Sequence, residues 1–196
     1  MRPSLVLLAG PNGSGKTTLY QTRVAPSFAG PFINADIIQK DELGDPSPEA
    51  SYEAAKIAAR RREEHLSARR SFVTETVFSH PSKLEIIETA RSAGFIVIVM
   101  HISTDDADLN VARVRARTQE GGHDVPEAKI RARYSRGGPL IRRAVLAADR
   151  GMVFDNSKLN APPEMMLLFS AGRLTRVAPK LPGWMLDAYD QDLRFA

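Results

Sequence analysis

Short apolar runs recur along the chain and alternate with longer segments in which apolar residues follow the spacing of a helix. The runs cover residues 4–9, 32–34, 71–75, 95–100 and 152–154. A short continuous apolar run bounded by glycine or polar residues is typical of a strand buried on both faces. Because strands that alternate with helices form parallel sheets, the pattern predicts an α/β fold with a mainly parallel central sheet between helical layers.

The segments between the strands carry helix signals. Ser47 is a suitable N-cap, and Pro48 suits the first turn of a helix that continues to about Arg70. Gly137-Gly138-Pro139 predicts an interruption between two helical stretches, because glycine and proline both disfavour helix interiors. The other helical segments are predicted from residue 15 onward and over residues 37–43, 83–92, 105–119, 127–134 and 140–149.

The C-terminal part of the chain has a different pattern. Residues 165–170 and 174–177 flank a glycine-containing turn and predict a hairpin. The tail, residues 179–196, is punctuated by prolines, and we expect its Trp184 and Tyr189 to pack against the body. No repeat or linker divides the 196 residues, so we predict a single domain over 1–196.

A glycine-rich loop joins the first strand to the first helix. It matches the phosphate-binding pattern G-x-x-x-x-G-K-[ST] at every fixed position, and its place between strand and helix is the one that the mechanism requires. Backbone N–H groups and the helix N-terminus then hold phosphate, Lys16 reaches the β and γ oxygens, and the Thr17 hydroxyl ligates Mg²⁺. We therefore predict ATP and Mg²⁺ as ligands, bound by Gly10, Pro11, Asn12, Gly13, Ser14, Gly15, Lys16, Thr17 and Thr18.

Composition narrows the class of protein further. The 27 basic residues exceed the 23 acidic ones, and 20 of them are arginine, whose fork of donors suits phosphate. The chain has no cysteine, which excludes disulfides and cysteine-ligated zinc and fits the cytoplasm. No apolar run is long enough to span a membrane. The arginines are dispersed and no RNA-recognition or zinc-finger motif is present, which argues against nucleic acid as the partner.

Phosphate-binding loops also occur in GTPases and motor ATPases. The motif that selects guanine does not match residues 154–158, which read Phe-Asp-Asn-Ser-Lys. The strongest aliphatic run, residues 95–100, is followed by His-Ile-Ser and not by the acidic residues of a motor. A kinase that phosphorylates a small molecule is therefore favoured.

A kinase needs a carboxylate near the γ-phosphate to accept the proton of the acceptor hydroxyl. Asp36 follows the second strand and should share one crevice with the glycine loop, so we predict that it is the base. Its alternative role is to cap the helical segment 37–43. Glu75 and Thr76 end the third strand on the same rim, and we expect them to bind substrate, although Glu75 could also be a surface charge.

Arginines cluster around the glycine-rich segment before residue 127. Arg113 and Arg117 are four residues apart and share one helix face, whereas Arg115 should point to solvent or to an acidic side chain. With His123, Arg131 and Arg133, they have the composition of a lid that brings positive charge to the γ-phosphate. The alternative is a solvated basic helix pair.

These motifs together resemble the zeta toxin family of P-loop kinases. The resemblance covers roughly residues 4–157 and rests on the blocks 10–18, 33–36, 74–76, 121–126 with 133–134, and 154–157. It implies that UDP-N-acetylglucosamine or a related nucleotide sugar is the acceptor, that Asp36 is the base and that Glu75 is a carboxylate on the substrate side. It also implies a toxin with a separate antitoxin. The chain departs from the larger toxins in placing His123 near the position of one of their two arginines.

The sequence thus predicts an ATP-dependent kinase with a P-loop kinase-like three-layer sandwich, a helical lid over about 117–138 and a C-terminal hairpin. The near alternative is a small-molecule or polynucleotide kinase of other specificity without a toxin role. The distant alternative is a non-catalytic protein that binds ATP or nucleic acid.

Overall fold

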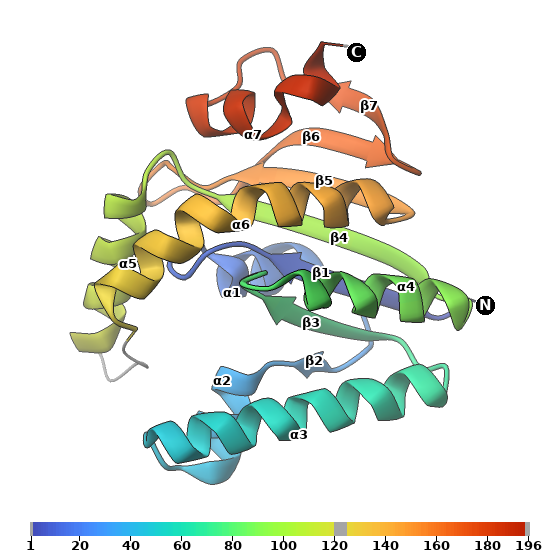
Figure 1. Ribbon diagram of the computed structural model, residues 1–196, viewed down its shortest axis with the longest axis vertical. Coiled ribbons are helices and arrows are strands. Elements are labelled where there is room, and N and C mark those ends of the chain that lie inside the picture. The colour runs from blue at the N-terminus through green and yellow to red at the C-terminus, as the bar shows by residue number, and fades with distance from the viewer. Residues whose placement is uncertain (1, 120–124, 195–196) are drawn as a thin grey trace.

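A seven-stranded sheet forms the centre of the computed structural model, which describes residues 2–119 and 125–194 (Figure 1). The strand order is β2-β3-β1-β4-β5-β6-β7; β1 to β5 are parallel, and β6 and β7 are antiparallel. The predicted fold class is confirmed, including the C-terminal hairpin. The strands are β1 (Ser4–Ala9), β2 (Phe32–Ile33), β3 (Phe72–Thr76), β4 (Ile96–Ser103), β5 (Arg150–Asp155), β6 (Glu164–Ser170) and β7 (Arg173–Val177).

Helices cover both faces of the sheet. In Figure 1, α3, α4, α6 and α7 lie in front of it and α1 lies behind it. None of the helices in the described part of the chain is long and apolar enough to cross a membrane. The helices are α1 (Lys16–Leu19), α2 (Ala35–Ile37), α3 (Pro48–Ser67), α4 (Glu85–Ser92), α5 (Ala107–Gln119), α6 (Glu127–Ala147) and α7 (Gly183–Leu193), with π-helical turns at Tyr20–Val24 and Ile38–Leu43 and a 3₁₀ turn at Pro81–Leu84.

The apolar runs place one core on each face because side chains alternate along a strand. Leu5 and Leu7 of β1 join the larger core under α3, α4, α6 and α7. Val6 and Leu8 point to the other face and pack with Leu19 of α1. These strands are buried on both sides, which explains why they read as continuous apolar runs.

The register of the parallel strands brings the ends of β1, β3, β4 and β5 to one rim. Ala9 pairs with Thr76 and with His101, and Ser103 pairs with Asp155. The segments that follow these strands, and the one that follows β2, therefore meet at the same edge of the sheet.

Helix α6 contradicts the predicted interruption at residues 137–139, because it runs unbroken from Glu127 to Ala147 with Pro139 inside it. Proline in a helix interior costs about 3 kcal/mol. Burial of Ile130, Ile141 and Val145 offsets this, since each such side chain contributes about 1.5–3 kcal/mol. Gly137 is buried where α6 passes the β3 side, and an added Cβ would lie 3.7 Å from the Val77 carbonyl oxygen. This is an ordinary van der Waals distance, so Gly137 neither breaks the helix nor is required there by packing.

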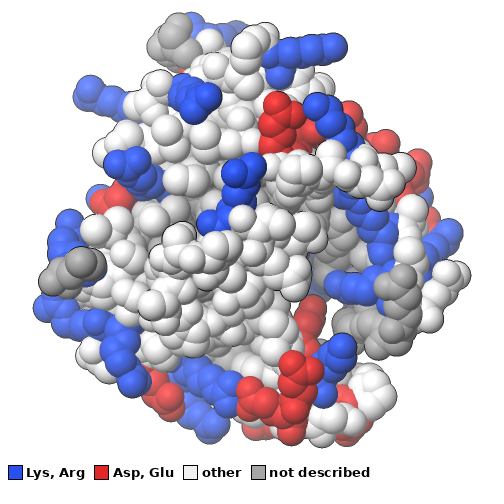
Figure 2. Space-filling model, turned by 180° about the vertical axis from the view of Figure 1, so that it is seen from behind, with Lys and Arg blue, Asp and Glu red and all other residues white. Residues whose placement is uncertain are grey.

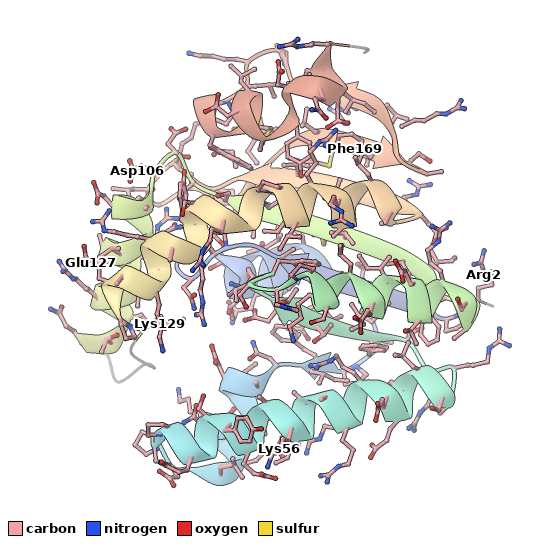
Figure 3. All side chains as sticks on the ribbon, in the orientation of Figure 1. Arg2, Lys56, Asp106, Glu127, Lys129 and Phe169 are labelled. Carbon is pink, nitrogen blue, oxygen red and sulfur yellow. The ribbon has the colours of Figure 1, made fainter. Side chains whose placement is uncertain are left out.

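The tail contains a helix, α7, that the prolines did not suggest. As predicted, Trp184 and Tyr189 pack against the body: Tyr189 is fully buried, its ring lying 5.7 Å from that of Phe169. Phe169 points from β6 toward α7 in Figure 3. The Arg142 guanidinium also donates to both carboxylate oxygens of Asp192, at 2.6 and 2.9 Å, which ties α7 to α6.

Candidate active site

The glycine loop after β1 has the conformation of a phosphate cradle. Gly13 and Gly15 have φ values of 78° and 98°, which residues other than glycine rarely adopt. A Cβ on Gly13 would lie 2.4 Å from the Asn110 carbonyl oxygen, and one on Gly15 would lie 2.2 Å from Asn156 Nδ2. Only glycine therefore fits at either position.

Lys16 lies inside the loop and is only 7% exposed. Its ammonium group donates to the carbonyl oxygens of Gly10 and Pro11, at 3.0 and 3.1 Å. Burial lowers the pKa of Lys16, and the nearby carboxylates of Glu75 and Asp36 act in the opposite direction. The lysine thus faces both predicted carboxylates from inside the phosphate-binding loop.

Glu75 has the environment of a functional carboxylate. Its Oε2 atom is buried and makes no hydrogen bond. Burial raises the pKa of Glu75, while Lys16 lowers it and Asp36 raises it further. A buried carboxylate oxygen without a partner is costly, so its retention indicates a site for a ligand. The alternative of a surface charge at the strand end does not fit this burial.

Asp36 lies at the first turn of α2 and is exposed to solvent. The alternative that it caps this helix is wrong, because the cap is Asn34: its Oδ1 accepts from the backbone N–H groups of Asp36 and Ile37, at 2.7 and 3.3 Å. Asn34 lies two residues before Asp36 and has the extended backbone that is usual for the N-cap residue of a helix. The Asp36 carboxylate is consequently not used for capping.

A cavity of about 400 Å³ brings most of the predicted residues together. It contains Lys16, Thr17, Asp36 and Glu75, and Thr17 is exposed into it. In Figure 2, which shows the molecule from behind, basic and acidic side chains both border a hollow at one edge of the molecule. The predicted residues that line the cavity are Asn12, Gly13, Gly15, Lys16, Thr17, Thr18, Asp36, Glu75, Arg113 and Arg117.

Helix α5 supplies the arginines of this cavity. Arg113 and Arg117 both line it, and Nη1 of Arg113 is buried without a hydrogen bond. Burial lowers the pKa of Arg113, and Asp155 opposes this shift. Arg115 points away and pairs with Glu127 at 2.5 Å, as predicted. Glu127 lies at the outer end of α6 in Figure 3.

Other predicted residues lie elsewhere. Arg133 does not line the cavity but donates to Asn12 Oδ1 at 2.8 Å, so it joins α6 to the glycine loop. Thr76 lines a second cavity, between α3 and α4, and its carbonyl oxygen accepts from the Gly10 N–H at 3.3 Å. His123 and most of the glycine-rich segment of the lid lie outside the described residues.

Sequence reasoning missed the contribution of the segment after β5. Asn156 is buried, and its side-chain amide donates to the Ser14 carbonyl oxygen at 2.9 Å. Lys158, Asn160 and Ala161 follow on the wall of the same cavity. The signal in the sequence was the run of polar residues directly after β5. Because the other parallel strands end at this rim, residues that follow β5 could have been expected to contribute to the site.

The donor set fits a magnesium ion. Mg²⁺ is commonly bound by one or two carboxylates or hydroxyls together with substrate phosphates and water. Thr17, Asp36 and Glu75 offer such oxygens on one cavity, and one Glu75 oxygen is buried without a partner. No cluster of three or more His, Cys, Asp or Glu suited to a metal occurs among residues 2–119 and 125–194.

Comparisons with known proteins place this site in a family. An uncharacterized protein of Haemophilus influenzae is 28% identical over 143 residues, which cover 68% of this chain and 94% of that protein. A crystal structure of AvrRxo1-ORF1:-ORF2 with ATP is similar in fold, with a TM-score of 0.70, 17% identity, and coverage of 97% of this chain and 63% of that chain. This chain therefore spans less than two thirds of that relative.

A structure from the PezAT chromosomal toxin-antitoxin system of Streptococcus pneumoniae has a TM-score of 0.66 and 16% identity over 99% of this chain and 87% of that chain. The family model for the AAA domain matches residues 5–140, which include the glycine loop, Asp36, Glu75 and the arginines of α5. The protein accordingly belongs to the AAA domain family.

Proposed function

We propose that the protein is an ATP-dependent kinase that transfers the γ-phosphoryl group to a hydroxyl of a small acceptor. The observation that carries this proposal is the meeting of Asp36 and Glu75 with Lys16 and Thr17 in one cavity. One carboxylate is enough to help hold the magnesium ion that accompanies the triphosphate, so the second is available for chemistry. A phosphotransferase needs one as a base.

The geometry supports a specific division of labour. Asp36 accepts the proton of the acceptor hydroxyl while the new bond forms between that oxygen and the γ-phosphorus. The bond from the γ-phosphorus to the β–γ bridging oxygen breaks, and ADP leaves. Lys16, Arg113 and Arg117 line the same cavity, where their positive charge stabilises the negative charge of the transferring oxygens. Thr17 and the carboxylates of the cavity would hold a magnesium ion, which would supply positive charge to the phosphates.

We further propose UDP-N-acetylglucosamine or a related nucleotide sugar as the acceptor, within a toxin that has a separate antitoxin. This narrower proposal is supported by the resemblance to zeta toxins and by the fold shared with the PezAT structure. A kinase of other specificity remains the second candidate, because the residues that hold Mg-ATP are the same in both cases.

The test is to incubate the protein with Mg-ATP and a panel of nucleotide sugars, nucleosides, sugars and oligonucleotides, and to seek the gain of one phosphoryl group by mass spectrometry. We expect Asp36→Asn to lower turnover by at least about 100-fold, as loss of a general base does, with little change in ATP affinity. Asp41→Asn, a neighbouring exposed aspartate outside the cavity, is the matched control. ATP hydrolysis without transfer to any acceptor, unchanged in Asp36→Asn, would contradict the kinase proposal.

A further inference from the structure

A second cavity, of about 340 Å³, lies between α3 and α4 over β3. Both helices lie on the front face of the sheet in Figure 1. Its apolar lining comes from Leu7, Leu66 and Ile86, and its polar lining includes the β3 threonines and Ser82. The cavity and the nucleotide site share one lining residue, Glu75. Thr76 also lines the second cavity, and its carbonyl oxygen accepts from the N–H of Gly10 in the glycine loop, so this end of the cavity lies beside the nucleotide site.

Arg62 of α3 is the half-buried charge of this cavity. Burial lowers the pKa of Arg62, and Glu63 acts in the opposite direction but forms no ion pair with it. The two preceding arginines differ: Arg60 pairs with Glu64 at 3.9 Å, and Arg61 pairs with Glu42 at 2.6 Å. Within the described part of the chain, Arg62 has neither a hydrogen bond nor an ion pair, although a partly desolvated guanidinium strongly favours an anionic partner.

Apart from Glu75, the other charges of the cavity are exposed to solvent. Lys83, Glu63 and Glu85 are all exposed, so water screens them. Arg62 is set deeper than these three and lies on the same lining as the apolar residues. A ligand that enters the cavity can thus bury an acidic group against the guanidinium and an apolar part against the floor.

We propose that this cavity holds the acceptor and that Arg62 binds an acidic group on it. The acceptors are then alcohols that carry a phosphate or a carboxylate away from the reacting hydroxyl. The acidic group lies at Arg62 and the hydroxyl lies at the Glu75 end, beside the nucleotide site. This inference rests on the proposed kinase function for its catalytic meaning, but the anion site can be measured without turnover.

The binding test uses protein saturated with Mg-ADP, which occupies the phosphate-binding loop and removes it as a competing anion site. Calorimetry then compares N-acetylglucosamine 1-phosphate, UDP-N-acetylglucosamine, glucuronate and neutral N-acetylglucosamine as probes. We expect at least one acidic probe to bind at least tenfold more tightly than the neutral sugar. We also expect Arg62→Gln to weaken that binding about 10- to 100-fold and Arg62→Lys to weaken it less. Arg60→Gln, on the same helix but outside the cavity, should change nothing.

The kinetic test separates this inference from the proposed function. In Arg62→Gln, KM for an acidic acceptor should rise while KM for ATP and the rate of ATP hydrolysis without acceptor stay constant. Neutral and acidic acceptors could instead be phosphorylated with equal kcat/KM, and Arg62→Gln could leave both values unchanged. This result would support the kinase function and would overturn the proposed role of Arg62. Failure of every acidic probe to bind in an Arg62-dependent way overturns it as well. Arg62-dependent binding without any phosphoryl transfer supports the anion site and refutes the kinase.

Discussion

The hydrogen bond from Asn156 to the glycine loop gives a prediction that can be worked out from the structure. The bond is buried, 2.9 Å long, and joins the end of β5 to the Ser14 carbonyl oxygen. Asn156→Ala removes the donor and leaves that oxygen without a partner, which costs about 1–3 kcal/mol. Because an amide of Asn156 also packs where a Cβ of Gly15 would lie, the freed space lets the loop leave its phosphate-binding conformation.

The cost should appear in two measurements. If it falls on the whole fold, each kcal/mol lowers Tm by about 2–4 °C in a protein of this size. If it falls on the loop alone, the same energy weakens ATP binding about 5- to 150-fold with little change in Tm. We expect the second result, since the sheet contacts of β5 do not involve the side chain.

Thermal unfolding and calorimetric titration of ATP distinguish these results. Asn156→Asp, which faces the carbonyl with an acceptor, should weaken ATP binding at least as much as Asn156→Ala. Asn160→Gly removes another side chain from the same cavity wall and suits the left-handed backbone there, φ 54°, so Tm should not fall. Normal ATP affinity in both Asn156 variants would refute the idea that this residue shapes the loop.

Three further predictions concern the supports of the site. Burial lowers the pKa of His101 from 6.5 to about 3, so between these pH values the unfolded chain binds a proton that the folded chain does not. The free energy of unfolding should therefore fall by up to about 1.4 kcal/mol per pH unit as the pH drops from 6.5 toward 3. Chemical denaturation at several pH values should show a weaker dependence of this free energy on pH in His101→Gln. Trp184→Phe removes the indole N–H that donates to Asp155 at 2.9 Å. We expect the free energy of unfolding, measured with urea, to fall by about 1.5–3 kcal/mol. An unchanged urea midpoint of unfolding would show that water replaces the hydrogen bond. Arg133→Gln breaks the hydrogen bond to Asn12 and should raise KM for ATP severalfold while Tm stays constant. A lower Tm with an unchanged KM for ATP would assign Arg133 a purely structural role.

The sequence was sufficient for the parts of the fold that depend on local pattern. The apolar runs located the parallel strands, and the glycine loop located the phosphate site, because both follow from short-range chemistry. Asp36 and Glu75 could be placed on one rim because the carboxyl ends of parallel strands meet there.

The rest depended on packing between distant segments. The sequence does not show that Pro139 is tolerated in α6, because the compensation comes from side chains buried against the sheet. Asn156 lies 142 residues from Ser14; the polar residues after β5 indicate that this segment lies at the rim, but they do not indicate its contact with Ser14. Arg62 stands in a run of three arginines, and only the ion pairs of its two neighbours distinguish it.

The two edges of the sheet have a consequence for the behaviour of the protein in solution. One edge strand, β2, is only two residues long, and the other, β7, carries Arg173 and Arg176. Short strands and strands with like charges are poor templates for the backbone of another molecule, so neither edge invites strands from neighbouring chains to extend the sheet. The folded sheet therefore offers neither of its edge strands as a site where the intermolecular β-pairing of aggregation would begin.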